Sequence, residues 1–290
     1  MKLLTVLAAL LAPLAFGQPG GKLLPEASSP LGMKYFSIAD EKGVVSAARR
    51  ALSDDPTNLG LILKLARAQA AVWQEREAVA TCTRGLSIDP SNADLLIERG
   101  HRELPLRDFE KALADLQNAA EFNPKKIDAW YHLGLAHYFL GHFAEAADAF
   151  RHAVDAAPNT DERINSTNWL YAALRRANRP KEAAEALAAI TPEMTNTEAH
   201  TLNYLNLVRL YQGRLTEAQI MPPDPPRDGS DVEAELRFDT VAYGVGNWHL
   251  FNGEREKARE LFRSVLLGKV WITWGFVAAE REMIANRERP

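Results

Sequence analysis

The chain has 290 residues, of which 47% are hydrophobic and 25% charged, values typical of a folded protein with a substantial apolar core. Its formal net charge is −4, whereas a nucleic-acid-binding protein typically has an excess of basic residues, so we expect no nucleic-acid partner. The single cysteine, Cys82, excludes an intramolecular disulfide.

Residues 1–17 are typical of a secretory signal peptide. Lys2 precedes an apolar run from Leu3 to Phe16, which is shorter than the roughly 20 residues that a transmembrane helix needs. Small residues at Ala15 and Gly17 form a cleavage site. We therefore expect an exported protein, periplasmic or secreted, that does not span a membrane after cleavage; the alternative is an uncleaved anchor. Residues 18–38 begin with a stretch rich in Gly, Pro and Ser and are expected to be a flexible lead-in.

Residues 39–220 contain an internal repeat with a period of 34 residues. The period is marked by the positions of five prolines, Pro56, Pro90, Pro124, Pro158 and Pro192. Each proline follows a pattern typical of an amphipathic helix, and proline ends a helix because it cannot donate the next backbone hydrogen bond. The period therefore predicts a series of helical hairpins.

The clearest repeat runs from residue 127 to residue 160. Its apolar and small side chains are Trp130, Leu133, Gly134, Ala146, Phe150 and Ala153, followed by Pro158. This pattern resembles the tetratricopeptide repeat. The resemblance implies an all-α fold, an α-solenoid of helix-turn-helix repeats in which each hairpin packs only against its neighbours.

A second pattern supports the same frame. Counting five residues back from Ala146, Ala183, Ala218 and Ala258 gives Gly141, Asn178, Gly213 and Gly253. Glycine and asparagine tolerate the left-handed backbone of a turn between helices. In the weaker repeats at 59–92 and 93–126, this turn position holds Trp73 and Arg107.

The array is interrupted at 221–231, where four prolines and a glycine exclude a continuous helix. Residues 232–290 are expected to form a final repeat and a C-terminal capping helix that begins near Trp271. One face of that helix is apolar, with Trp271 and Trp274, and the other face, with Glu280 and Arg281, is expected to be exposed and charged.

No pattern in the sequence indicates a catalyst. The chain has no GxSxG, no HExxH, no paired cysteines and no glycine-rich phosphate loop between a strand and a helix. His132, His137 and His142 are spaced five residues apart and diverge around a helix, while His137 and His249 hold equivalent repeat positions that favour packing. We predict no catalytic residue, no metal and no cofactor.

The resemblance implies a concave groove lined by the first helix of each hairpin. The groove positions are Leu63, Arg67, Ile97, His101, Tyr131, Leu135 and Tyr138, with Asn165, Asn168 and Arg175 as candidates in the next hairpin. The lysine, asparagine and arginine with which one subgroup grips a peptide carboxylate are absent. The alternative is that Tyr131 and Tyr138 pack against neighbouring repeats.

We therefore expect a non-catalytic protein-interaction scaffold or adaptor outside the cytoplasm. Its partner would be a protein or peptide whose extended segment or helix lies in the groove with apolar side chains inserted. The alternative is a binding protein for a small molecule or glycan, which would use the aromatic side chains of the groove.

Overall fold

The structure is a computed structural model that describes residues 24–195 and 198–287. The predicted signal peptide at 1–17 lies outside the described residues. Within them the fold is all-helical, apart from one short antiparallel hairpin, and the helices stack as tetratricopeptide-like repeats. The predicted fold class is therefore confirmed. No helix in the described part of the chain is long and apolar enough to cross a membrane.

Six pairs of consecutive helices make up the array. A single helix, α1 (Val44–Asp54), precedes them, and α14 (Trp274–Arg287) follows them. The pairs are α2 (Leu59–Ala70) with α3 (Glu75–Leu86), α4 (Ala93–Glu103) with α5 (Phe109–Phe122), α6 (Ile127–Leu140) with α7 (Phe143–Ala156), α8 (Thr160–Arg176) with α9 (Pro180–Ala188), α10 (Ala199–Tyr211) with α11 (Glu217–Ile220), and α12 (Val232–Phe251) with α13 (Arg255–Val265). Residues 221–231 are non-helical and join α11 to α12.

The starts of the first helices explain part of the 34-residue period. Asn58, Asn92 and Asn159 each follow a repeat proline and cap the next helix. Their side-chain oxygens accept hydrogen bonds from the backbone N–H groups of Leu61, Leu95 and Glu162. An N-terminal cap satisfies one of the donors that a helix leaves unpaired, and contributes about 1 kcal/mol.

Glycine lets the two helices of a pair approach closely. A Cβ atom placed on Gly134 of α6 would lie 2.6 Å from the Phe150 ring of α7. The equivalent Gly246 of α12 would meet Phe262 of α13 at 2.7 Å. Both distances are far below ordinary carbon–carbon contact, so the small residue of the repeat is required by the ring that packs over it.

The predicted turn positions adopt left-handed backbone. The φ angles are 84° at Gly141, 59° at Asn178, 71° at Gly213 and 82° at Gly253. Trp73 and Arg107 occupy the same position in the first two pairs and take the same conformation, with φ of 58° and 67°. The turn is thus kept even where the residue is unfavourable for it.

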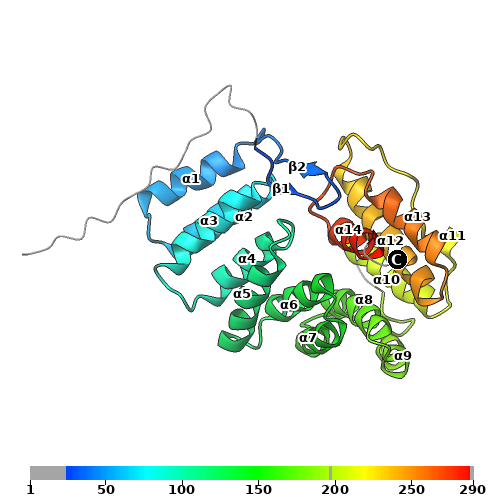
Figure 1. Ribbon diagram of the computed structural model, residues 1–290. Helices are drawn as coiled ribbons and strands as arrows, with labels where there is room; N and C mark the ends of the chain where they lie inside the picture. The colour runs from blue at the N-terminus through cyan, green and yellow to red at the C-terminus, as the bar shows by residue number, and fades with distance from the viewer. Residues whose placement is uncertain (1–23, 196–197, 288–290) are drawn as a thin grey trace, which may run out of the picture.

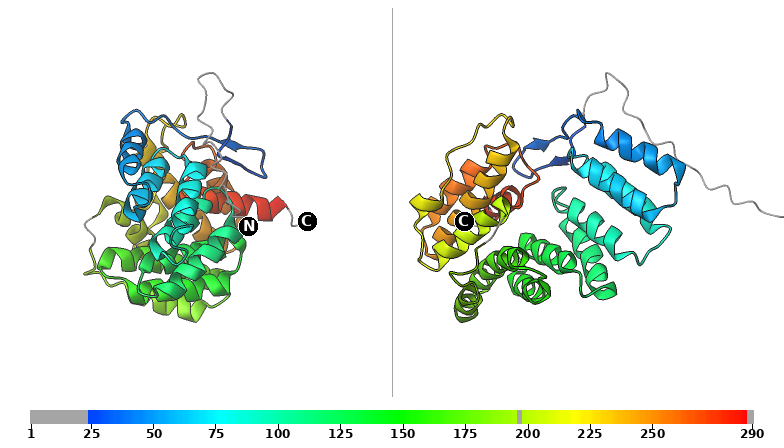
Figure 2. Two further views of the ribbon diagram at one scale, coloured as in Figure 1. Left: turned by 90° about the vertical axis from the view of Figure 1, so that its left-hand side faces the viewer. Right: turned by 180° about the vertical axis from the view of Figure 1, so that it is seen from behind.

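The helix pairs follow a curved path that brings the two ends of the array together (Figures 1 and 2). Strands β1 (Ala27–Ser28) and β2 (Lys34–Tyr35) form a hairpin that lies between the N-terminal helices and α12–α14. Ala27 and Tyr35 are buried there. From residue 24 onward, the predicted flexible lead-in is therefore wrong: the segment packs because its apolar side chains reach the C-terminal helices.

Helix α14 packs against α12 and α13, the last pair of the array. The fit against α12 is tight, since a Cβ on Gly275 would lie 2.2 Å from the backbone oxygen of Asp239. The expectation that the opposite face of α14 is exposed is wrong, because Glu280 is completely buried. That face is turned toward α6 and the turn between α4 and α5.

Candidate functional site

The inner helices of the first three repeats line an open pocket of about 420 Å³ on the concave side. We call it the concave pocket. Its wall is made by Arg67 and Ala70 of α2, by Ala71 directly after α2, by Ile97, Glu98, His101 and Arg102 of α4, and by Asp128 and His132 of α6. The repeat geometry places these side chains on one surface, because successive first helices lie side by side.

An ion-pair chain runs along one side of the concave pocket. The Glu98 carboxylate lies between two guanidinium groups, 3.0 Å from Arg67 Nε and 3.2 Å from Arg102 Nε. Arg102 also lies 3.7 Å from the buried Glu75, whose pKa is raised to about 7 by burial. The Arg67 side chain is 63% exposed, so its terminal nitrogens remain accessible to a ligand.

Stacked rings form another side of the concave pocket. The His101 and His132 rings are stacked with centroids 4.1 Å apart, and the Trp274 ring lies 5.1 Å from His101. Burial lowers the pKa of both histidines, which keeps them neutral near pH 7. His132 Nδ1 is 2.8 Å from the backbone oxygen of Asp128 and donates to it, so its Nε2 is an acceptor.

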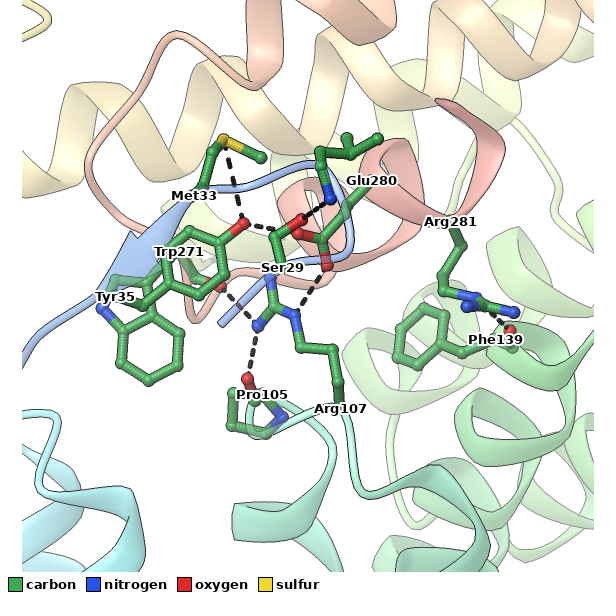
Figure 3. Close-up of polar contacts among 10 residues, drawn as sticks. Ser29, Met33, Tyr35, Pro105, Arg107, Phe139, Trp271, Glu280 and Arg281 are labelled. Atoms are coloured by element: carbon green, nitrogen blue, oxygen red, sulfur yellow. Dashed lines mark hydrogen bonds and ion pairs between the residues drawn. The ribbon is translucent and has the colours of Figure 1, made fainter. Parts of the chain in front are cut away.

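A second cluster joins the two ends of the array (Figure 3). We call it the clasp; it consists of Tyr35, Arg107, Trp271 and Glu280, which Figure 3 shows, together with Trp73. Glu280 accepts hydrogen bonds from Arg107 Nε at 2.7 Å and from the Tyr35 hydroxyl at 2.5 Å. The Tyr35 and Trp271 rings are stacked 5.3 Å apart, and the Arg107 guanidinium lies over the Tyr35 ring. The cluster thus links the N-terminal hairpin, the first two turns and α14.

The two unfavourable turn residues are both in the clasp. Trp73 packs edge-on against Trp271 with ring centroids 6.5 Å apart, and Arg107 pairs with Glu280. Left-handed backbone costs a non-glycine residue about 1–2 kcal/mol. Each side chain therefore makes contacts with the other end of the molecule that a glycine in the same turn could not make.

Comparisons with known proteins agree with the repeat frame. Residues 107–141 match the model described as TPR repeat, and residues 127–160 match the model described as tetratricopeptide repeat. Residues 107–160 of this chain carry tetratricopeptide repeats. Repeats of this class mediate binding to proteins and peptides. A search of curated proteins gives no match.

Three of the solved structures that match this chain have low sequence identity to it. A tetratricopeptide repeat protein from Parabacteroides merdae is 19% identical, with 82% of this chain and 91% of that chain covered and a TM-score of 0.49. YrrB, described as a TPR protein with an unusual peptide-binding site, is 16% identical over 84% of this chain and 99% of its own, with a TM-score of 0.46. MamA is 22% identical over 50% of this chain and 83% of its own, with a TM-score of 0.45.

Of the groove residues predicted from the tetratricopeptide frame, some lie together in the structure and others lie in the core. Arg67, Ile97 and His101 line the concave pocket, as a single surface. Leu63, Tyr131 and Asn165 are half-buried on α2, α6 and α8 and do not line it. Arg175 is directed to the end of α12, where it donates to the backbone oxygen of Phe251.

Leu135, Tyr138 and Asn168 do not face an open groove, contrary to the prediction. Their exposed fractions are 0%, 4% and 5%. The Tyr138 hydroxyl accepts from Asn247 Nδ2 at 2.7 Å and lies 3.0 Å from the Tyr243 hydroxyl, and both partners are on α12. The later repeats therefore cover the inner face of α6 and α8, and replacing Tyr138 would disturb the core.

The sequence reasoning missed the acidic and basic residues of the concave pocket, Glu98, Arg102 and Asp128, and the whole of the clasp. The only local signal for the clasp was the presence of Trp73 and Arg107 where the repeat has glycine or asparagine. Within the described residues, no group of three His, Cys, Asp or Glu side chains could hold a metal ion. Cys82 is fully buried in α3, and burial raises the pKa of its thiol to about 12.

Proposed function

We propose that the protein is a non-catalytic adaptor that holds a peptide segment of a partner protein in the concave pocket. The observation that carries this proposal is the composition of the pocket. Three successive inner helices present an apolar wall, a stack of neutral rings and a guanidinium with accessible donors. Apolar anchors give affinity to such a surface and hydrogen bonds give it specificity.

The chemistry of the concave pocket favours one kind of segment. Ala70, Ala71 and Ile97 can contact an aliphatic side chain, while the terminal nitrogens of Arg67 can hold a carboxylate with two parallel hydrogen bonds. The other guanidinium, Arg102, is already occupied by Glu75 and Glu98. We therefore infer that the partner presents an aliphatic residue next to an acidic one.

The alternative, a small-molecule or glycan-binding protein, required ring faces of Tyr131 and Tyr138 in an open groove. Tyr138 is buried, and the Tyr131 ring packs edge-on against Phe150. Neither ring is free to stack on a sugar, which leaves the adaptor as the better-supported function.

We also propose that the adaptor works outside the cytoplasm, in the periplasm or as a secreted protein. The support for this location is the N-terminal sequence, with Lys2, the apolar run to Phe16 and the small residues Ala15 and Gly17. Mass spectrometry of the protein recovered from its producing cells tests it. A mature chain that starts at Gln18 is expected, and a chain that still carries Met1 contradicts cleavage.

Site-specific photo-cross-linking tests the binding site. A photoreactive amino acid replaces Ala71, at the rim of the concave pocket, or Ala80, which is exposed on α3 and does not line the pocket. We expect a protein adduct at position 71 that Arg67→Glu weakens and that is absent at position 80. Equal adducts at both positions, or an adduct at 71 that is insensitive to Arg67→Glu, would rule out the pocket as the binding site.

A further inference from the structure

We propose that the clasp is a releasable closure, so that the protein exchanges between a closed arch and an open arch, and that the closure regulates the concave pocket. The effect on the pocket rests on the proposed function, but the closure itself does not. It follows from how differently the repeats and the two ends are held together.

The repeats are joined by apolar packing along their whole length, whereas the ends meet through a small cluster in which buried aromatic rings surround an ion pair. Consecutive helix pairs bury alanine, leucine and phenylalanine against each other along the whole array. The N-terminal hairpin and the first turns reach the C-terminal segment through the clasp and through Trp271 Nε1, which donates to the Phe36 backbone oxygen at 3.0 Å. Because a repeat contacts only its neighbours, small changes in packing geometry at each interface add up along the array. The distance between the two ends is therefore the dimension of the molecule that changes most easily.

The chemistry at the contact also favours reversibility. Glu280 is buried, and its two hydrogen-bond partners, Tyr35 and Arg107, both come from the N-terminal half. When the ends separate, the carboxylate and the guanidinium regain water, and this hydration offsets most of the attraction that is lost. A wholly apolar contact would have no such compensation. Opening also exposes the buried rings of Tyr35, Trp73 and Trp271, so the closed arch is the dominant form and the open arch is a minor one.

The clasp is linked to the concave pocket through α14, although no clasp residue lines the pocket. Trp274 starts α14 three residues after Trp271, and its ring lies against His101 and near His132, which line the pocket. Arg281 further along α14 donates to the Phe139 backbone oxygen of α6 at 2.9 Å. If the ends separate, these contacts are lost and the stacked rings of the pocket lose one neighbour. A ligand that prefers one form of the pocket then shifts the closure, and the closure shifts its affinity by the same factor.

The closure can be measured without a partner. Spin labels on cysteines that replace Arg84 of α3 and Arg263 of α13 report the distance between the two ends, since both positions are exposed and the native Cys82 is fully buried. The decisive variant is Arg107→Gly, which removes the guanidinium but suits the left-handed turn, so that the repeat remains folded. Tyr35→Phe removes only the hydroxyl that donates to Glu280.

We expect the distance distribution to gain a longer component in both variants, with unchanged helicity by circular dichroism. The matched control is Arg99→Ala, which breaks a bidentate pair between α4 and α5, with Arg99 nitrogens 2.5 and 2.7 Å from the Asp115 oxygens. It should lower stability and leave the distances unchanged. A wild-type distribution in Arg107→Gly would overturn the proposal, whatever the outcome of the cross-linking at position 71.

Discussion

Arg107 has a backbone conformation that its own side chain disfavours, and its guanidinium is held by a carboxylate 173 residues away. These two facts have opposite effects on stability. Glycine at this position would relieve about 1 kcal/mol of backbone strain, but would leave Glu280 buried without its cation, which costs more. The residue is therefore explained by the contact that it makes with the far end of the chain.

A double-mutant cycle separates the two effects. We expect Arg107→Gly to destabilise the wild-type protein but to be neutral or stabilising in a Glu280→Gln background, where no buried charge is left unpaired. The coupling energy should be about 1–3 kcal/mol, measured by urea unfolding of the four proteins. Additive effects would show that Arg107 does not act through Glu280.

Asp239 predicts a pH dependence of stability. Burial raises the pKa of this carboxyl to about 8, although the hydroxyl of Thr273, 2.8 Å away, lowers it somewhat. A carboxyl with a raised pKa binds its proton more tightly in the folded protein. Its contribution to stability is therefore complete at acid pH and is lost as the pH rises from about 4 to about 8.

We expect the free energy of unfolding to fall between pH 5 and pH 8, by at most about 4 kcal/mol from this residue. Asp239→Asn should remove much of that slope, because the amide keeps the shape but does not titrate. Asp224→Asn, at an exposed position in the 221–231 segment, is the control and should leave the slope unchanged. Urea unfolding at both pH values measures it, and an equal slope in Asp239→Asn would contradict the assignment.

At the scale of one residue, the sequence predicted the backbone conformations that depend on residues nearby in the chain. Gly141 and Asn178 were recognisable as turn residues because the repeat frame fixes their position and left-handed backbone restricts their identity. Glu280 was placed on an exposed face, because the periodicity of one helix contains no information about Arg107 or Tyr35. A buried charge can be predicted only when its partner is known.

At the scale of the helix pair, the glycine under the ring limits what the repeat tolerates. We expect Gly134→Ala to cost about 1–3 kcal/mol, because the new methyl group must displace the Phe150 ring that now fills its place. Alanine is otherwise the better helix former, so a loss of stability can come only from packing. Thermal unfolding measures the change.

Ala114→Leu on the exposed side of α5 is the control for Gly134→Ala and should change stability by less than about 0.5 kcal/mol. A stabilised Gly134→Ala protein would mean that the two helices can separate without cost.

The helix pairs were predicted well because period, turn residue and proline all specify the same hairpin. The N-terminal hairpin was not predicted, for a physical reason. Its strands have two residues each, too few for an alternating pattern, and the composition around them is that of a linker. What orders it is the stacking of Tyr35 on Trp271, a contact that no local pattern indicates.

At the scale of the whole molecule, the closed path of the array was not predictable from the repeat. The repeat motif specifies how a hairpin packs on the next, but the curvature that brings α14 back to the first turns is a sum of small rotations. This is why Arg67, Ile97 and His101 lie together at the concave pocket while Leu135, Tyr138 and Asn168 are buried. The first three lie where the concave side stays open, and the others lie where later repeats cover it.

Hydrogen exchange tests whether contact with the C-terminal segment orders the N-terminal hairpin. We expect Trp271→Ala to abolish the protection of the amides in residues 24–38, including the Glu26 N–H that donates to the Tyr35 oxygen at 2.7 Å. Trp130→Ala is the control. Its ring stacks on His152 away from the clasp, so it should affect only its own repeat. Protection of the hairpin that survives Trp271→Ala would show that the first repeats order it alone.

The clasp also has a consequence for the order in which the chain folds. Tyr35 and Glu280 are 245 residues apart, so the hairpin is synthesised early but cannot reach its final neighbours until almost the whole chain is made. At ordinary rates of translation this interval lasts roughly 10–50 s. Nascent repeats can stack during that time, one after another, while Tyr35 and Trp73 stay uncovered. The last step of folding is then the meeting of the first-made and last-made segments, the contact with the longest loop to close.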